Sequence, residues 1–470
     1  MEFKVLKKTL FFLVMLSGWV LIQSCDPVEE EVSTNPAHQL IFSSDTVRFD
    51  TLLSSVGSIT RRFRIYNPHK NAIEIDRLAL GQTNASPYTL TVNGVKGKTF
   101  EKEIIFGKDS LMVLVEVFID PTDEDMPYLV KDSVQVEYNQ NASDVKLVAW
   151  GQDAYFLDRE VVECDVTWTA GKPYVLYDTV LVAAGCQLTV EPGARIFIDN
   201  NSALAIGGTL KIQGTAEDKV IIRNTRFDAG YDVAPGQWNS ILFLEGSKDN
   251  IIDHADIKNG VIGLRVGSPD DDVDYDLIVS NTSIGHMSSA GILAFTSDIY
   301  VFNTEVFNCQ SELVGNYLGG NYKYEHCTFS NAPSLYTREV TSVVLSDYIS
   351  LGDGSTLSED LSVELVNSII WGEEDEELSI YSSGASNVTI ALHDNIIRSA
   401  NEDWVTLGND ISQERNYPEF HVPAFYDYQI DSLSPARGKA IASEISLDLI
   451  GTLRDTMPDL GAYERKDSLP

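Results

Sequence analysis

Basic residues are scarce in this sequence. It contains 34 lysines and arginines against 70 aspartates and glutamates, which gives a formal net charge of −36. Such a surface repels nucleic acid and anionic lipid, and it repels polyanionic sugars unless a cation bridges the two. The composition therefore argues against nucleic acid as a partner.

The apolar run at the amino terminus is too short to cross a membrane. Thr9 to Ile22 form an apolar core of about 14 residues, whereas a membrane-spanning helix needs about 20. We therefore predict a signal peptide in residues 1–24. The sequence Ile22-Gln23-Ser24-Cys25 resembles a bacterial lipobox, which implies that Cys25 is lipidated and becomes the mature amino terminus.

Residues 25–38 lack a periodic pattern and combine acidic residues with proline, so they are predicted to form an acidic tether. The acidic run after Cys25 resembles the export signal of lipoproteins of the Bacteroidota. That resemblance implies a lipid-anchored position in the outer membrane, at the cell surface of a Gram-negative bacterium. A solvated linker without any signal is the alternative interpretation.

Residues 39–155 show alternating strands separated by turn residues, which predicts a β-sandwich. The runs that alternate best are 60–66, 72–75, 88–92, 111–119, 133–138 and 145–150. The layout FRIYNPHKNAIEI, SLMVLVEVFIDPT and VKLVAWGQD resembles the Ig-like domains of the abnormal-spindle and sperm-protein type. Such domains are usually spacers or docking surfaces.

Helical patterns are absent from Tyr174 to Asn224, where short β-branched runs are separated by Gly, Pro and Asn every six to ten residues. The runs 188–191, 194–198, 203–206, 209–212 and 220–222 are predicted to be successive strands of a solenoid. We therefore predict an all-β chain, with the Ig-like sandwich followed by a right-handed, single-stranded parallel β-helix over residues 156–400.

Further repeats share an Asn or His three residues before an apolar position. The Asn or His positions 254, 281, 303 and 326 recur at intervals of 27, 22 and 23 residues, and a gap of 41 to Asn367 implies an inserted loop near 337–361. Stacking such coils places like residues on one another. An interior ladder is expected from Ile257, Ile284, Val306, Phe329, Ile370 and Ile396. The Asn and His column, which ends at His393, is expected to form a hydrogen-bonded ladder at a turn.

Two groups of segments resemble the pectate-lyase-like superfamily of β-helix repeat proteins, especially secreted and surface members from Bacteroidota. They are LTVEPGARIFI with the segments that follow it to residue 266, and the tail that includes DLIGTLRDTMPDLGAYE. The resemblance implies that residues 401–470 close the β-helix. The superfamily contains lyases, hydrolases and proteins with no demonstrated chemistry, so it assigns no catalytic residue here.

Cysteine is scarce, with five residues in the chain. Cys164 and Cys186 lie 22 residues apart, which is the length of one coil, so a disulfide or a stack of thiols is one hypothesis. The alternative is that both are small buried apolar residues.

Two sets of residues are candidates for a site. Asp270, Asp272, Asp274 and Asp276 crowd one loop, and Ca²⁺ is the ion that such oxygen-rich loops take, although a solvated acidic run is the alternative. Arg265, Phe295 and Tyr317 are expected in one outward column of the coils, where aromatic rings stack on sugars beside a polar anchor. Lateral packing is the alternative for these rings. No outward acid pair is found in that column.

These observations favour a surface-exposed outer-membrane lipoprotein that binds glycans or mediates adhesion without catalysis, and they call for no cofactor other than the Ca²⁺ considered above. Its expected partners are the membrane, through the lipid anchor, and a polysaccharide or other surface protein. Two alternatives remain open: a polysaccharide lyase or glycoside hydrolase, and a structural or assembly lipoprotein.

Overall fold

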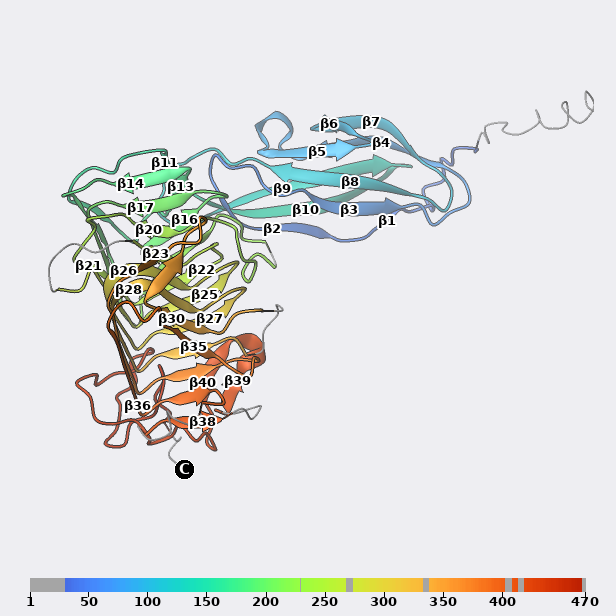
Figure 1. Ribbon diagram of the computed structural model, residues 1–470. Coiled ribbons are helices and arrows are strands. Elements are labelled where there is room, and N and C mark those ends of the chain that lie inside the picture. Colours follow the sequence, from blue (N-terminus) through green and yellow to red (C-terminus); the bar gives the residue numbers. More distant parts are fainter. Residues whose placement is uncertain are drawn as a thin grey trace, which may run out of the picture. The chain divides into compact units, whose positions relative to one another are not determined.

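The structure is a computed structural model that describes residues 30–228, 230–267, 274–332, 338–401, 408–412 and 418–466. These residues belong to two compact units. The first runs to Thr122 and includes Pro127–Gly151, and the second comprises Asp123–Met126 and the chain from Gln152 onward. Both units consist almost wholly of strands (Figure 1).

The first unit is a sandwich of antiparallel sheets. In its described residues, one sheet contains, in spatial order, β1 (Ile41–Phe42), β3 (Arg61–Tyr66), β8 (Ser110–Val117), β5 (Tyr88–Val92) and β6 (Val95–Gly97). The other contains β2 (Thr46–Leu53), β10 (Asn141–Gln152), β9 (Tyr128–Tyr138), β4 (Ile73–Leu80) and β7 (Thr99–Ile105). A short 3-10 helix, η1 (Thr83–Ala85), precedes β5. Each predicted run overlaps one of these strands, so the sandwich is confirmed.

The core of the sandwich follows from the period of two along each strand. On β8, the alternate residues Val113, Val115 and Val117 are buried against the facing sheet. The described end of the predicted tether also contacts this unit, because the backbone N–H of Ser33 donates to the carbonyl of Ala72 at 2.8 Å. Residues 30–38 are therefore ordered against the sandwich and do not extend away from it.

The second unit is a parallel β-helix. Its coils contribute strands in turn to three sheets that surround a single apolar interior, although the coils at the two ends do not have a strand in every sheet (Figure 1). The third sheet, as we name it, contains β11 (Tyr155–Asp158), β13 (Tyr174–Tyr177), β16 (Arg195–Ile198), β19 (Val220–Asn224), β22 (Ala255–Lys258), β25 (Ser283–Met287), β27 (Glu305–Cys309), β29 (Thr328–Ser330), β34 (Ile369–Trp371), β37 (Ile396–Arg398) and β38 (Asp410–Ser412).

We call the other two sheets of the β-helix the first and the second sheet. They are joined at a corner by two long strands, β26 (Ile292–Phe302) and β28 (Val314–Glu325), which pass through both. The first sheet also contains β14 (Thr179–Val182), β17 (Ala203–Ile206), β20 (Ile241–Phe243), β23 (Leu264–Val266), β30 (Val343–Ser346) and β35 (Leu378–Tyr381). The second also contains β12 (Val166–Trp168), β15 (Gln187–Val190), β18 (Thr209–Gln213), β21 (Asn250–Asp253), β24 (Leu277–Ser280), β33 (Leu361–Val366) and β36 (Val388–His393). These parallel sheets confirm the predicted β-helix.

The corner depends on a local break in the strand conformation. The register between β26 and β28 shifts between Phe295 and Ser297, and Thr296 has a φ of 44°. Opposite it, Gly320 has a φ of 113°, and a Cβ there would lie 2.6 Å from the carbonyl oxygen of Ser297. Only glycine fits such a position. It therefore stands where β28, with β26 beside it, bends from the first sheet into the second.

Two short hairpins lie outside the coils. The predicted insertion near 337–361 contains β31 (Tyr348–Ser350), paired with β32 (Thr356–Ser358), but it also contains β30, which belongs to the first sheet. Near the carboxyl end, β39 (Phe420–Val422) pairs with β40 (Asp427–Ile430) around the 3-10 helix η3 (Pro423–Phe425). The coils also continue beyond residue 400, because β38 pairs with β37.

The predicted interior ladder is confirmed for its first five members and wrong for its last. Each of these residues pairs with the next one along the helix, and all five are fully buried: Ile257, Ile284, Val306, Phe329 and Ile370. The partner of Ile370 is Ile397, however, and Ile396 points to the other face of the sheet, where it packs with Leu460. Because side chains alternate along a strand, a slip of one residue in the alignment was enough to reverse the assignment.

The predicted polar column lies at the turn between the second and third sheets. His254, Asn281, Asn303, His326 and Asn367 all have φ between 45° and 54°, a conformation that Asn tolerates better than most residues. Asn303 Nδ2 donates to Asn281 Oδ1 at 3.2 Å, and Asn367 Nδ2 lies 3.1 Å from His326 Nε2. The column is thus confirmed, with these hydrogen bonds linking two of its adjacent pairs, although its last member is Asp394, at a φ of 54°, and not the predicted His393, because of the same slip.

Cys164 and Cys186 form a disulfide, which links two points 22 residues apart in the first coils. Cys309 and Cys327 are buried and free. Among the described residues, no helix is long and apolar enough to cross a membrane.

Candidate functional site

The predicted Ca²⁺ loop is described only in part. Asp270 and Asp272 lie outside the described residues, as does Cys25. Asp274 is exposed, but Asp276 is buried, and its Oδ2 accepts a hydrogen bond from the backbone N–H of Asp298 at 2.9 Å. Within the described ranges, no three His, Cys, Asp or Glu side chains are grouped to hold a metal ion. Ca²⁺ binding at this loop stays a prediction.

Arg265 is exposed on β23, but it does not share a row with Phe295 as expected. Its neighbours across the strands are Leu242 and Leu293, because the register between β23 and β26 is two residues away from the predicted alignment. A shift of two residues keeps a side chain on the same face. Arg265 therefore faces outward from the first sheet, one row away from Phe295.

Phe295 and Tyr317 are brought together as a half-buried aromatic pair. They are direct neighbours on β26 and β28, and their rings stack with centroids 5.9 Å apart and an interplanar angle of 27°. The Tyr317 hydroxyl donates to Glu312 Oε1 at 3.2 Å. Burial first, and the neighbouring carboxylate of Glu312 second, raise the pKa of Tyr317, so its hydroxyl stays protonated.

A groove begins on the other side of the corner, on the outer face of the second sheet. Its cavity volume is about 410 Å³. The register of β26, β28, β33 and β36 places one outward residue from each strand in a single row, namely Asp298, Asn321, Ser362 and Thr389. The rest of the lining comes from Thr296, Gly320, Glu359, Asp360, Leu361 and Asn387.

The groove is lined by groups that form hydrogen bonds and that carry no positive charge. Among the described residues, its lining holds carboxylates, amides and hydroxyls and no lysine or arginine. Asp360 Oδ1 and Oδ2 accept hydrogen bonds from the backbone N–H and side-chain amide of Asn387 at 2.8 and 2.9 Å. These bonds lower the pKa of Asp360, so it is a carboxylate at neutral pH and an acceptor for hydroxyl donors.

An outward acid pair does occur on the second sheet, although not in the column where sequence reasoning looked for one. Glu325 on β28 and Glu364 on β33 both approach Lys323, with Nζ–Oε2 distances of 3.3 and 3.8 Å. The sum of these two distances sets an upper limit of about 7 Å on the separation of the two oxygens, which does not exceed the separations that glycoside hydrolases use. The ammonium group of Lys323 forms an ion pair with each of these two carboxylates.

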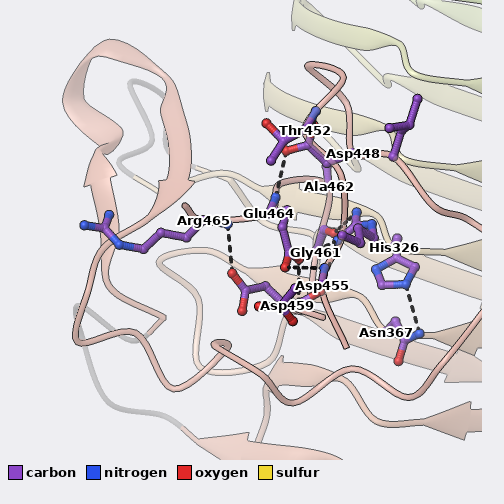
Figure 2. A network of polar contacts seen from close by, with 12 residues as sticks. His326, Asn367, Asp448, Thr452, Asp455, Asp459, Gly461, Ala462, Glu464 and Arg465 are labelled. Carbon is purple, nitrogen blue, oxygen red and sulfur yellow. Dashed lines mark hydrogen bonds and ion pairs between the residues drawn. The ribbon is translucent and has the colours of Figure 1, made fainter. Parts of the chain in front are cut away.

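The outer face of the third sheet is covered by the carboxyl-terminal segment 418–466. Arg454 reaches the polar column, where its Nη2 donates to Asn303 Oδ1 at 2.9 Å, and it forms an ion pair with Glu464 at 3.5 Å. Figure 2 shows this network around Asp448, Asp459 and Glu464, beside His326 and Asn367. Gly461 N–H also donates to the carbonyl of Asn367 at 2.8 Å. The covering segment is thus fixed to the ladder of the coils.

Carboxyl groups with raised pKa lie under this cover. Burial raises the pKa of Glu305 to about 7, although Ser283 and Tyr463 donate hydrogen bonds to it at 2.7 and 2.8 Å. Burial also raises the pKa of Asp459 and of Glu464. All three have structural partners inside the molecule, so burial in this closed interface accounts for their raised pKa values.

Sequence comparison leaves this site without an assigned chemistry. No family model matches the chain, and no curated protein matches it in sequence. Pectate lyase Pel9A is a structural neighbour with 13% identity and a TM-score of 0.30, over 67% of this chain and 88% of that chain. The catalytic unit of a GH87 α-1,3-glucanase from Streptomyces thermodiastaticus has 11% identity and a TM-score of 0.24, over 71% and 79%.

The sandwich has its own neighbour, the ASH/PapD-like domain of human CEP192, with 10% identity and a TM-score of 0.17, over 27% of this chain and 92% of that chain. Scores this low add nothing to the fold that strand pairing establishes. The predicted Ig-like assignment of the sandwich stays a prediction.

Sequence reasoning found the aromatic pair and missed the groove. Asp298, Asn321, Ser362 and Thr389 are separated by irregular intervals in the sequence, because an insertion lies between β28 and β33. The signal that was available is the alternation within each strand, since Asp298, Asn321 and Ser362 each occupy an outward position beside a buried residue, and Thr389 lies between two partly buried ones.

Proposed function

We propose that this protein is a non-catalytic glycan-binding lipoprotein, and that its β-helix binds a saccharide at the corner formed by β26 and β28. One observation carries the proposal: a stacked aromatic pair lies beside a groove of about 410 Å³ lined by hydrogen-bonding groups. Phe295 is three residues from Asp298 on β26, and Tyr317 is four residues from Asn321 on β28. Thr296, between the pair and the groove, lines the groove itself.

This combination suits a neutral sugar. An aromatic face packs against the C–H groups of a sugar ring, while carboxylates and amides accept and donate hydrogen bonds to its hydroxyls. The described lining of the groove contains the acidic residues Asp298, Glu359 and Asp360 and no lysine or arginine, so a polyuronate would be repelled. Arg265, in the next row of the first sheet, is the polar anchor available to the end of such a ligand.

The test is a binding screen with purified protein against immobilised neutral and anionic oligosaccharides. We expect neutral glycans to bind, and the double variant Phe295→Ala/Tyr317→Ala to lose most of that binding. Phe156 and Tyr177 form another stacked pair, with centroids 6.2 Å apart, so Phe156→Ala/Tyr177→Ala is the matched control and should bind normally. Equal binding by all three proteins would refute the corner as the site.

The enzyme alternative has one specific observation in its favour, the acid pair Glu325 and Glu364. Hydrolysis requires one of the two to act as a proton donor at the scissile bond. Lys323 forms ion pairs with both carboxylates, an arrangement that suits binding better than acid catalysis. Release of reducing ends from a bound glycan, abolished by Glu364→Gln and by Glu325→Gln, would establish the hydrolase in place of the binding protein.

The remaining parts of the proposal concern the anchor and the ion. We propose that Cys25 is lipidated and that the protein lies at the surface of the outer membrane; Cys25→Ala should then appear in the soluble fraction. Ca²⁺ at the loop 270–276 is proposed to order the loop and not to act in catalysis. Calorimetry with Ca²⁺ should show binding that Asp272→Ala abolishes, with no release of sugar products.

A further inference from the structure

A second hollow lies on the same outer face as the groove, at the other end of the same strands. Its cavity volume is about 190 Å³. The side chains of Lys323, Glu325, Glu364 and His393 line it from β28, β33 and β36, and residues 441–443 of the carboxyl-terminal segment form one wall. This hollow takes no part in the corner site described above.

An aromatic cluster borders this second hollow. The rings of Tyr275 and Phe302 lie 5.5 and 5.0 Å from that of Tyr300. The Tyr300 hydroxyl donates to Glu325 Oε2 at 2.8 Å, and Lys323 Nζ lies 5.2 Å from the centroid of the Tyr300 ring. The hollow therefore has the same components as the corner site, namely aromatic rings beside carboxylates, with a cation added.

The strand register places the two hollows in line. On β28, Asn321 lines the groove and Glu325 lines the second hollow; on β36, Thr389 and His393 occupy the corresponding positions. In both strands the two residues are four positions apart, which keeps them on one face at a separation of about 13 Å. That distance is longer than a single sugar ring. Lys323 and Glu364, which line the second hollow, share with Tyr300 the row next to that of Asn321, and all three are partly or fully accessible to solvent.

We propose that the groove and the second hollow are two subsites of one surface that binds an extended polysaccharide chain running parallel to the strands of the second sheet. This inference rests on the proposed function and deepens it, because it assigns the ligand class as an internal stretch of a polymer and not as a terminal sugar. The two hollows together hold five carboxylates and one lysine, so the polymer is a neutral one.

Chain-length dependence tests this inference. Calorimetry would measure the binding of cello-, xylo- and laminari-oligosaccharides, from disaccharide to hexasaccharide, to the full protein. We expect the affinity of the preferred series to rise by about tenfold or more once the ligand is long enough to reach both hollows. His393→Ala should remove that gain and leave disaccharide binding unchanged. His421→Ala, which changes an exposed histidine outside both hollows, is the matched control and should behave as wild type.

The outcomes separate the inference from the proposed function. An affinity that does not depend on chain length, yet is lost in Phe295→Ala/Tyr317→Ala, would overturn the extended surface and leave the corner site standing. So would an equal loss of disaccharide and hexasaccharide binding in His393→Ala. Absence of binding by every oligosaccharide would overturn both. A melting temperature equal to that of wild type shows that each variant is folded.

Discussion

The third sheet of the β-helix and the other two sheets differ in what covers their outer faces. On the third sheet, Phe307 packs against Tyr428 of β40, and Trp371 and Ile369 form a small core with Leu460. On the second sheet, Asn321, Ser362 and Thr389 face solvent. The same coil therefore presents an apolar outward strip on one side and a polar strip on another.

Because only one of these faces is covered, their charged side chains differ in how far they are exposed to solvent. Under the cover, Arg454 and Glu464 are each 3% exposed, and both hydrogen-bond to other groups of the protein, Arg454 through its two Nη atoms. On the open face, Lys323 and Glu364 are 30% and 48% exposed and pair with each other at 3.8 Å. A buried charge depends on its partner for stability, whereas an exposed one is solvated and remains available to a ligand. The difference separates structural charges from binding ones.

Arg454→Leu is the change with the largest expected effect. It leaves Glu464 buried without its ion-pair partner and removes the bonds to Asn303 and Gly461. Breaking a buried pair in this way costs about 3–5 kcal/mol of unfolding free energy. Urea unfolding followed by circular dichroism measures it. Arg159→Leu, which breaks the exposed pair with Asp178, is the matched control and should cost less than about 1 kcal/mol. Equal losses in the two variants would remove the distinction between the faces.

Glu305→Gln tests the cover through its pH dependence. Burial raises the pKa of Glu305 from its ordinary value of 4.5 to about 7, so the folded state favours the protonated form. The stabilising contribution is then fully present below pH 4.5 and is lost as the pH rises through 7. Across that window, the wild type should lose stability on the order of 3 kcal/mol relative to Glu305→Gln.

The difference between the two proteins is the quantity to measure, because other groups titrate at lower pH. Burial lowers the pKa of His326 to about 3 and that of His286 to about 4. Both histidines destabilise the fold on acidification, in the variant as in the wild type, and their effect cancels in the difference. Parallel stability curves for wild type and Glu305→Gln between pH 4.5 and pH 8 would show that the cover leaves Glu305 accessible to water.

The interior of the coils could be predicted from the sequence, and the alignment failed only at its last step. Burial imposes a strict alternation, so Ile257, Ile284, Val306 and Phe329 were placed correctly from spacing alone. The alignment also placed Ile370 correctly across the insertion, but the coils have no fixed length, and the prediction of the next partner, Ile397, slipped by one residue. Local pattern determines which face a residue takes, but it does not determine how far a loop displaces the next strand.

The sequence predicted only those residues of the candidate site that lie at equivalent positions of adjacent coils. Phe295 and Tyr317 occupy equivalent places in adjacent coils, so their pairing followed from the repeat. The groove depends on the corner at Thr296 and Gly320, and on contributions from β33 and β36. A bend in the backbone and the meeting of distant strands leave no periodic trace in the sequence. The same holds for the cover, because Arg454 reaches Asn303 across 151 residues.

Gly461→Ala should have an intermediate effect, since it disturbs the cover without removing a charge. Gly461 has a φ of 88°, and an added Cβ would lie 2.7 Å from Thr328 Oγ1 and 2.8 Å from Ile369 Cδ1. The strain and the clash together should cost about 2 kcal/mol. Gly384→Ala is the control, because Gly384 has a φ of 73° with open space around its Cβ. It should cost about 1 kcal/mol, and an equal cost in both would mean that the cover moves aside freely.

The smallest effect is expected from Glu364→Gln, compared with the same change at Glu464. Glu364 is 48% exposed, and its one ion pair, at 3.8 Å from Lys323, is long and screened by water. Its loss should change the unfolding free energy by less than about 0.5 kcal/mol. Glu464, in contrast, accepts hydrogen bonds from the N–H groups of Asp455 and Asp459 at 3.1 and 2.8 Å. A glutamine there can accept only one of the two and turns its own amide donor toward the other, so it should cost about 2 kcal/mol or more. Thermal unfolding of the two variants side by side measures the contrast. A loss at Glu364 as large as that at Glu464 would mean that the acid pair of the open face is a structural element, and the second hollow would then no longer be free to receive a sugar.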